Sequence, residues 1–446
     1  MNFLWKKVQS KKVPKDDEVA SSNLAKSIFS FYSSGAMAKL VPKKNGKSKY
    51  DSNVFWLGMV SLLADASSEM ISAVMPLFLA NTLGASGLVI GLIEGLGKAA
   101  ERLLSFVFGW YSDKIGKRRP VIAAGYLLST LMKGAFAFTS TWPQFLMVRT
   151  AERTGKAIRD APRDALLAAS TSASIKGRRA GFALHRMLDT IGSIIGPLIA
   201  LAVIAALATD FENTARTLFS LSVIPGLIAV LVILFLIKEP KIPESKRNHK
   251  SLKNSFSLNY GPDYKKFLFA MVPFFLFTPQ IAFLYLQAQN TGLVLSSIVG
   301  LGFVFGIFYL VGAGLLSFLS KYTRISKEKG VDFSLILMFA AFLIVALIQT
   351  VNHDVAVHSV EIFAFAFVLY SVGMGMFEVE SKSYLSLLVK EKEMAGAFGS
   401  YQTVTGVMII LSGLIFGFLW DISTTLSFYA AAFATLLAYI IFKVRK

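Results

Sequence analysis

Long apolar segments separated by short polar ones make up most of the chain after residue 53. A helix that crosses a lipid bilayer needs about 20 mostly apolar residues. The predicted spans are 54–80, 87–111, 119–139, 143–169, 180–208, 215–237, 265–288, 294–319, 332–351, 358–388, 395–419 and 424–443. The fourth is broken up by charged residues, and it is retained because the alternation of the loops requires it. The pattern predicts an all-α integral membrane protein with about twelve transmembrane helices.

The connections between these spans alternate in charge. One set is rich in Lys and Arg and comprises 113–119, 176–179, 238–266, 321–329, 390–392 and the end 443–446. The other set contains no Lys or Arg and comprises 81–86, 140–142, 210–213, 290–292, 351–354 and 421–423. Because basic loops are retained in the cytoplasm, we expect a multi-pass protein of the cytoplasmic (inner or plasma) membrane with both termini cytoplasmic.

The chain divides into two related parts around its longest basic connection. We expect a basic cytoplasmic tail at 1–53, a six-helix half at 54–237, a cytoplasmic linker at 238–264 and a second six-helix half at 265–446. A weak repeat supports this division, because similar small residues open the fifth span (Ala180-Gly181) and the eleventh (Ala395-Gly396). Two related halves with a site between them are typical of secondary transporters.

Composition excludes several other classes of protein. The chain is 54% hydrophobic yet carries a net charge of +19, and a soluble protein could not bury that much apolar surface. The surplus Lys and Arg lie between apolar spans, so nucleic acid is not an expected partner. Cysteine is absent and only 4 histidines occur, so we expect no metal site. A nucleotide-driven pump is not expected, because the phosphate-loop-like Gly95–Lys98 has the wrong spacing and lacks the following Ser or Thr. We expect no cofactor and no enzymatic activity, because the sequence contains no His/Cys metal cluster and no nucleophile elbow.

A basic motif lies between the second and third spans, where residues 109–118 read GWYSDKIGKR. It resembles the G-x-x-x-D-[RK]-x-G-[RK]-[RK] signature of the major facilitator superfamily, and the twelve-span layout extends the resemblance over 54–446. The resemblance implies a conformational gate, with Asp113 at the N-terminal end of the eleventh helix. The gate residues are Gly109, Asp113, Lys114, Gly116, Lys117 and Arg118. In the second half Phe318 stands where an Asp would be expected, so the lock is one-sided.

Two other spans carry partial matches to the same superfamily. In the fourth, Arg149 and Gly155 fit the family pattern, although Arg153 replaces a glycine, and residues 153–166 resemble an uncharacterised bacterial branch. In the fifth, Gly192 and Gly196-Pro197 resemble part of a motif associated with exporters that exchange drug for proton. The incomplete match leans towards export.

Ionisable groups at membrane depth are costly, so each is expected to face a partner or a wet cavity. The candidates for proton coupling and for the substrate cavity are Asp65, Glu69, Glu94, Arg149, Glu152, Arg153, His185 and Asp189. Asp65 and Glu69 lie one turn apart near the predicted midplane and repel one another. We therefore expect them to bind and release the coupled proton.

The other intramembrane charges leave alternatives open. Acids and bases alternate on one face of the second span, and we expect them to pair with one another there; the group is Glu94, Lys98, Glu101 and Arg102. Arg149 and Arg153 either neutralise Asp65 and Glu69 or bind an anionic solute. Pro273 and Pro279 are expected to interrupt the seventh span. The phenylalanine-rich stretches 274–277 and 303–308 are expected to face lipid or to pack.

Together these features predict a secondary active transporter that moves a small solute by alternating access. Proton coupling is expected, with export favoured over uptake of a small organic anion. A non-transporting sensor or scaffold with the same fold is the alternative from another class. The expected partners are a small-molecule solute, protons and the lipid bilayer, and the protein is expected to act as a monomer.

Overall fold

The computed structural model describes residues 43–44, 47–48, 52–171, 175–207, 209–239, 260–319, 327–348, 350, 359–389 and 394–444. Almost all of the predicted tail 1–53 and most of the linker 238–264 therefore lie outside the described residues. So do most of the basic connections at 321–329 and 390–392.

Helices account for nearly all of the described chain. The first group comprises α4 (Ser52–Ser72), α5 (Val74–Asn81), α6 (Gly87–Ile115), α7 (Arg119–Ala135), the 3-10 turn η1 (Phe136–Phe138), α8 (Trp142–Ala169), α9 (Ile175–Leu207), α10 (Phe211–Leu221) and α11 (Val223–Leu236). The second comprises α12 (Pro262–Phe277), α13 (Ile281–Asn290), α14 (Leu295–Leu319), α15 (Lys327–Ile348), α16 (Ser359–Leu385), α17 (Met394–Ile422) and α18 (Thr424–Val444). Two short strands, β1 (Lys43–Lys44) and β2 (Lys47–Ser48), pair antiparallel before α4.

The pairs α4/α5, α7/η1, α10/α11 and α12/α13 each form one broken span, so the described helices correspond to the twelve predicted spans. The predicted all-α membrane fold is confirmed. Within the described residues, 10 spans are long and apolar enough to cross a membrane by composition alone. The remaining two, α6 and α8, fall short because both carry stripes of charged residues.

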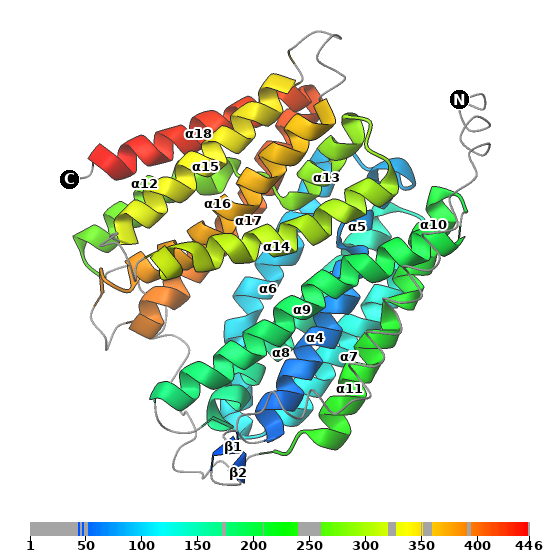
Figure 1. The fold of residues 1–446 in the computed structure, drawn as a ribbon, viewed down its shortest axis with the longest axis vertical. Helices are drawn as coiled ribbons and strands as arrows, with labels where there is room; N and C mark the ends of the chain where they lie inside the picture. Colours follow the sequence, from blue (N-terminus) through cyan, green and yellow to red (C-terminus); the bar gives the residue numbers. More distant parts are fainter. Residues whose placement is uncertain are drawn as a thin grey trace.

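The helices form two groups, α4–α11 and α12–α18, which are blue to green and yellow to red in Figure 1. Contacts between the groups run along α6 with α17, α9 with α14 and α5 with α13. We call the side where α6 ends at Ile115 and α18 ends at Val444 the basic face, after its lysines and arginines, and the other side the opposite face. The two groups diverge towards the start of α9 and the end of α16, on the basic face (Figure 1).

Glycines seal the two groups together near the opposite face. A Cβ on Gly91 of α6 would lie 1.9 Å from the carbonyl oxygen of Gly413 on α17, so only glycine allows this backbone contact. One turn earlier, the Asp421 carboxylate accepts hydrogen bonds from the backbone N–H groups of Gly87 (2.6 Å) and Leu88 (2.9 Å). A carboxylate of the second group thus caps the positive N-terminal end of α6.

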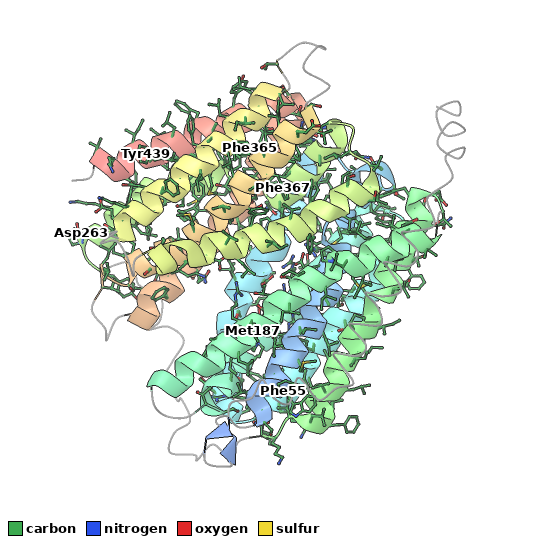
Figure 2. The ribbon with its side chains drawn as sticks, in the orientation of Figure 1. Phe55, Met187, Asp263, Phe365, Phe367 and Tyr439 are labelled. Atoms are coloured by element: carbon green, nitrogen blue, oxygen red, sulfur yellow. The ribbon has the colours of Figure 1, made fainter. Side chains whose placement is uncertain are left out.

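The outer surface is rich in exposed apolar side chains, as expected for contact with lipid. Phe365 on α16 is 58% exposed and points away from the protein in Figure 2. The core, in contrast, contains buried charged side chains such as Lys133 and Arg159. Those charges lie on the helices that form the candidate site.

Candidate functional site: a charged cavity between the two helix groups

A cavity of about 870 Å³ lies between the two helix groups and is lined by residues of both. Its volume falls in the range of sites that enclose small molecules, which is roughly 300–1,000 Å³. The lining extends to Lys382 and Phe398, within about a turn of the basic-face ends of α16 and α17. The glycine contacts between α6 and α17 close the other end, so the cavity faces the basic face.

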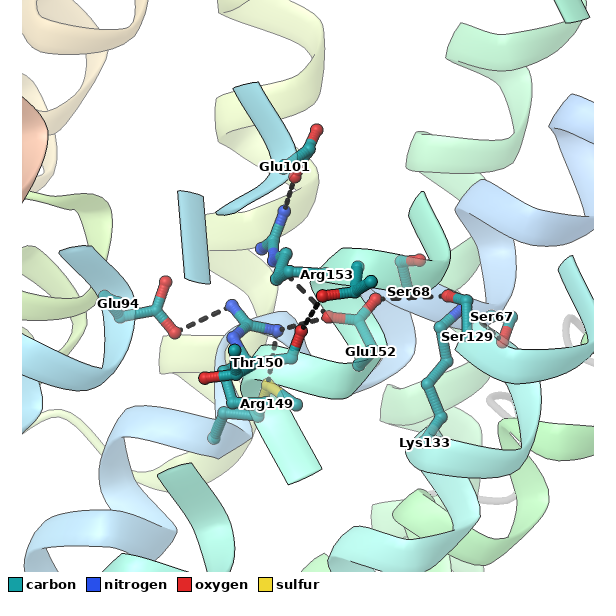
Figure 3. Close-up of polar contacts among 12 residues, drawn as sticks. Ser67, Ser68, Glu94, Glu101, Ser129, Lys133, Arg149, Thr150, Glu152 and Arg153 are labelled. Atoms are coloured by element: carbon teal, nitrogen blue, oxygen red, sulfur yellow. Dashed lines mark hydrogen bonds and ion pairs between the residues drawn. The ribbon is translucent and has the colours of Figure 1, made fainter. Parts of the chain in front are cut away.

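Arg149 on α8 is the centre of a buried ion cluster in the first group (Figure 3). Its guanidinium donates to Glu94 of α6 at 2.7 Å and to Glu152 on its own helix at 3.3 Å. Ser129 of α7 donates a further hydrogen bond to Glu152 at 3.3 Å. The side chains of Arg149 and Glu152 are only 9% and 4% exposed, so water screens this cluster little.

Arg153 continues the cluster one turn closer to the basic face. It donates to Glu101 of α6 at 2.5 Å and forms an ion pair with Glu152 at 3.3 Å. The expectation that acids and bases of the second span pair with one another is therefore wrong, because Glu94 and Glu101 pair with α8. Nor do Arg149 and Arg153 pair with Asp65 and Glu69. The packing of α6 against α8 determined these partners, and spacing within one helix could not show it.

Asp65 on α4 has a different partner from the one that its spacing indicates. Its carboxyl group is hydrogen-bonded to the carboxyl group of Asp189 on α9, and both line the cavity. Glu69, the expected partner, lies further along the cavity wall. A hydrogen bond between two carboxyl groups needs a proton on one of them, because two carboxylates have no donor. The site that the structure brings together is thus Asp65 with Asp189.

The close approach of α4 and α9 produces this contact. A Cβ on Gly192 would lie 2.2 Å from the carbonyl oxygen of Leu62, and a Cβ on Gly196 would lie 2.7 Å from that of Ala66. On the same side of α9, His185 shares a hydrogen bond of 2.8 Å with Ser61 of α4. The Gly192–Gly196 pattern identified in the sequence is therefore a helix-packing motif here.

A chain of polar contacts connects Asp189 to the second helix group. Arg186, one turn from Asp189 on α9, forms an ion pair with it at 3.0 Å and also interacts electrostatically with Tyr309 of α14. Tyr309 donates a hydrogen bond to Glu378 of α16, which pairs with Lys382 at 3.0 Å. The Arg186 side chain is 61% exposed to the cavity and bridges its two walls.

The second group contributes mainly aromatic rings and one break in the backbone. Phe274, Phe275 and Phe305 pack in or against the hydrophobic core, as expected, and they also line the cavity. α12 ends at Phe277 and α13 begins at Ile281, and the break contains Pro279, as expected. The other proline, Pro273, stays inside α12.

Two predicted cavity residues lie behind the wall. Glu152 is buried below Arg149 and Arg153, and His185 is buried against α4. The remaining candidates of that group line the cavity; they are Asp65, Glu69, Glu94, Arg149, Arg153 and Asp189. Among the described residues no cluster of three or more His, Cys, Asp or Glu side chains is arranged to hold a metal ion.

The basic motif forms a compact turn between α6 and α7. Gly116 adopts a left-handed conformation with φ +66°, which glycine adopts readily. Arg118 pairs with Asp113 at 3.0 Å and donates to the carbonyl of Ala165 at 2.9 Å. Glu239 accepts from the backbone N–H of Arg118 at 2.9 Å. Within the described residues Asp113 contacts Arg118 of its own loop, and no contact with the start of α17 is found.

The family model for the Major Facilitator Superfamily matches residues 57–352. The chain belongs to this superfamily. The predicted family resemblance is thereby confirmed, and the protein is a multi-pass membrane transporter.

The chain is similar to proteins of other organisms. An uncharacterised MFS-type transporter of Methanocaldococcus jannaschii is 28% identical over 376 residues, which is 84% of this chain and 90% of the relative. An uncharacterised protein of Mycobacterium tuberculosis (strain H37Rv) is 35% identical over 189 residues, 42% of this chain and 44% of the relative.

Solved transporter structures share the fold. The nucleoside transporter NupG superposes with a TM-score of 0.68 at 16% identity, over 88% of this chain and 99% of that one. The peptide transporter POT, solved in complex with sulfate, superposes with a TM-score of 0.71 at 12% identity, over 91% of this chain and 96% of that one. At these identities the likeness shows the superfamily fold alone.

Sequence reasoning missed two polar residues at or near the site. Lys133 of α7 does not line the cavity but is buried and donates to Ser67 at 3.0 Å, and a lysine inside an apolar span could have signalled it. Tyr309 gave no such signal, because a tyrosine in an apolar helix is ordinary.

Proposed function

We propose that this chain is a proton-coupled secondary transporter of a small solute, with Asp65 and Asp189 as its proton site. The observation that carries the proposal is the hydrogen bond between these two carboxyl groups on the cavity wall. Such a pair shares one proton, because two carboxylates in contact repel. Arg186 pairs with Asp189 and favours its charged form, so the proton resides on Asp65.

Loss of that proton changes what Arg186 does. Two carboxylates would then compete for one guanidinium, and Arg186 would be drawn from Tyr309 of the second helix group towards Asp65. The state of Asp65 thereby biases a contact between the two groups. Coupling of proton movement to solute movement requires a group whose protonation state favours one of the protein's two conformations.

Solute moves through the same cavity as the groups rock between two arrangements, one open to the basic face and one open to the opposite face. We place the basic face in the cytoplasm, following the loop charges. Export in exchange for protons is the proposed direction. Gly192 and Gly196 support this direction. They belong to the exporter-like motif, and they pack against α4, the helix that carries Asp65.

Proteoliposomes loaded with a pH-sensitive dye test the proposal. Panels of small solutes are added outside, and a transported solute should produce a proton flux that the dye records. The Asp65→Asn variant should still exchange labelled solute for unlabelled solute but should produce no proton flux. Solute movement in the unmodified protein with no accompanying proton movement would contradict the proposal. Absence of movement for every solute would instead favour a sensor or scaffold.

A further inference from the structure

Most acidic side chains on the first-group wall of the cavity already have a cation. Glu94 pairs with Arg149, and Glu101 pairs with Arg153. Asp189 pairs with Arg186 at 3.0 Å and Asp160 with Arg163 at 3.5 Å.

Three cavity cations are left over. Lys98 and Arg102 on α6 and Lys156 on α8 line the cavity, and among the described residues they form no ion pair or hydrogen bond. Each is only partly buried, so its charged group is open to the cavity. Among the described residues, two acids on this wall have no ion pair: Glu69 and Asp65, both on α4, and Asp65 contacts Asp189.

The three cations lie at neighbouring levels of two packed helices. Lys98 and Arg102 are one turn apart and share a face of α6. The bond between Arg153 and Glu101 sets the register of α8 against α6, and Lys156 follows Arg153 by three positions. Lys156 therefore lies beside the turn that carries Glu101 and Arg102. Glu69 lies elsewhere, against Gly196 of α9 and close to Tyr285 of α13.

Lysines and arginines at membrane depth that lack an ion pair are costly and mark a site for a partner that is not part of the helix bundle. A Lys or Arg cluster is suited to carboxylate or phosphate, and arginine can bind either with two parallel hydrogen bonds. A cationic solute would be repelled from the same place. These three cations therefore favour an anion at this part of the wall.

The wall contributed by the second helix group carries several aromatic side chains. Phe275 of α12, Phe305 of α14 and Phe398 of α17 line it and are partly exposed. Phe275 continues into a cluster with Phe377 and Tyr401, whose ring centroids lie 6.0 Å and 6.2 Å from its own. An inorganic anion would leave this surface unused, whereas a solute with an apolar or aromatic part would cover it.

We infer that the cavity binds an organic anion that has an apolar or aromatic part. Lys98, Arg102 and Lys156 bind its carboxylate or phosphate, and its apolar part packs on Phe275 and Phe305. The inference rests on the proposed function in using the same cavity as the solute path, but binding at this site requires no proton movement.

Calorimetric titration of the full chain in detergent at constant pH tests the inference. The anionic probes are benzoate, 2-naphthoate and phenyl phosphate, each compared with a neutral counterpart (benzamide, 2-naphthamide and benzyl alcohol). At least one anion should bind at least tenfold more tightly than its counterpart, and the preferred anion separates a carboxylate site from a phosphate site. If every anion fails to bind, or binds no more tightly than its counterpart, the inference is wrong.

Charge variants locate the site. Lys98→Gln and Lys156→Gln should each weaken the preferred anion about tenfold, as expected when a charged hydrogen bond is removed. Lys98→Arg should retain most of the affinity because it keeps the charge. The matched control is Lys265→Gln, which removes the same charge from an exposed position at the start of α12, outside the cavity. Equal loss in the control, or no loss in either cavity variant, would overturn the assignment.

Binding and coupling fail in distinguishable ways. An anion that binds and moves without protons would refute the proposed coupling and leave the anion site intact. If only neutral solutes move, and they move together with protons, the proposed coupling stands and the anion site is refuted.

Discussion

Asp65 of α4 and Asp189 of α9 are hydrogen-bonded through their carboxyl groups at the wall of the central cavity. The pair is connected through Arg186 and Tyr309 to the other helix group. Arg186 therefore links a titratable contact inside one helix group to the interface between the two groups, and this interface opens and closes during transport.

Arg186→Gln should uncouple solute movement from proton movement. The variant loses both the ion pair with Asp189 and the electrostatic interaction with Tyr309, so the charge on Asp65 no longer influences the contact between the halves. In proteoliposomes, solute exchange should persist while the ratio of protons to solute falls towards zero. Arg186→Lys is the matched variant; it keeps the charge and should retain part of the coupling. An unchanged ratio of protons to solute in Arg186→Gln would show that Arg186 takes no part in the coupling.

Gly91→Val should open the opposite-face seal. The added side chain would overlap the backbone of Gly413, where even a Cβ comes within 1.9 Å of a carbonyl oxygen. The chain has 0 cysteines, so a single Ser412→Cys substitution reports cavity access without background. This cysteine should react faster with a membrane-impermeant thiol reagent added on the side of Asn290.

Gly300→Val is the control for that measurement, because a Cβ there meets nothing within 4 Å. It should leave the labelling rate near that of the parent. Equal labelling of the Gly91→Val variant and its parent would show that this contact does not close the cavity.

Arg149→Ala should destabilise the protein by about 3–5 kcal/mol, because it leaves Glu94 and Glu152 buried without their shared cation. The control Lys266→Ala removes an exposed ion pair with Asp263, whose loss costs less than about 1 kcal/mol. Unfolding temperatures in detergent measure both. Adding Glu94→Gln to Arg149→Ala should recover part of the loss, and similar unfolding temperatures for all variants would show that the cluster is not structural.

Asp113→Asn should slow transport more than it weakens solute binding. Asp113 pairs with Arg118 in the arrangement described here, and by family resemblance it contacts the start of α17 when the cavity faces the opposite side. The substitution would weaken that second arrangement and leave the cavity unchanged. Turnover equal to that of the unmodified protein would show that the motif at residues 109–118 only holds its loop in place.

Sequence was sufficient for the spans, because each must hide its backbone polar groups from lipid inside a long apolar helix. The charged span α8 could also be predicted, because the loops before and after it must lie on opposite sides of the membrane. The left-handed Gly116 was also predictable, because it depends on the local backbone preference of one residue. The break at Pro279 was expected too, but Pro273, which has the same preference, lies inside α12, so packing decides which proline interrupts the helix.

The partners of the charged residues could not be predicted in the same way. Helical spacing indicated Asp65 with Glu69 and Glu94 with Lys98, but both acids pair with other helices. Those partners depend on which helices are neighbours and in which register they pack, and close contacts such as the one at Gly192 set that register. A single sequence contains no direct record of it.

The protonation of Asp65 is the central claim, and infrared difference spectroscopy between low and high pH measures it without a solute. The unmodified protein in detergent should show the C=O stretching band of a protonated carboxylic acid that disappears as pH rises, because the shared proton is lost. Asp65→Asn should lack this band, while Glu69→Gln should retain it. A band that persists in Asp65→Asn, or that disappears in Glu69→Gln, would contradict the account.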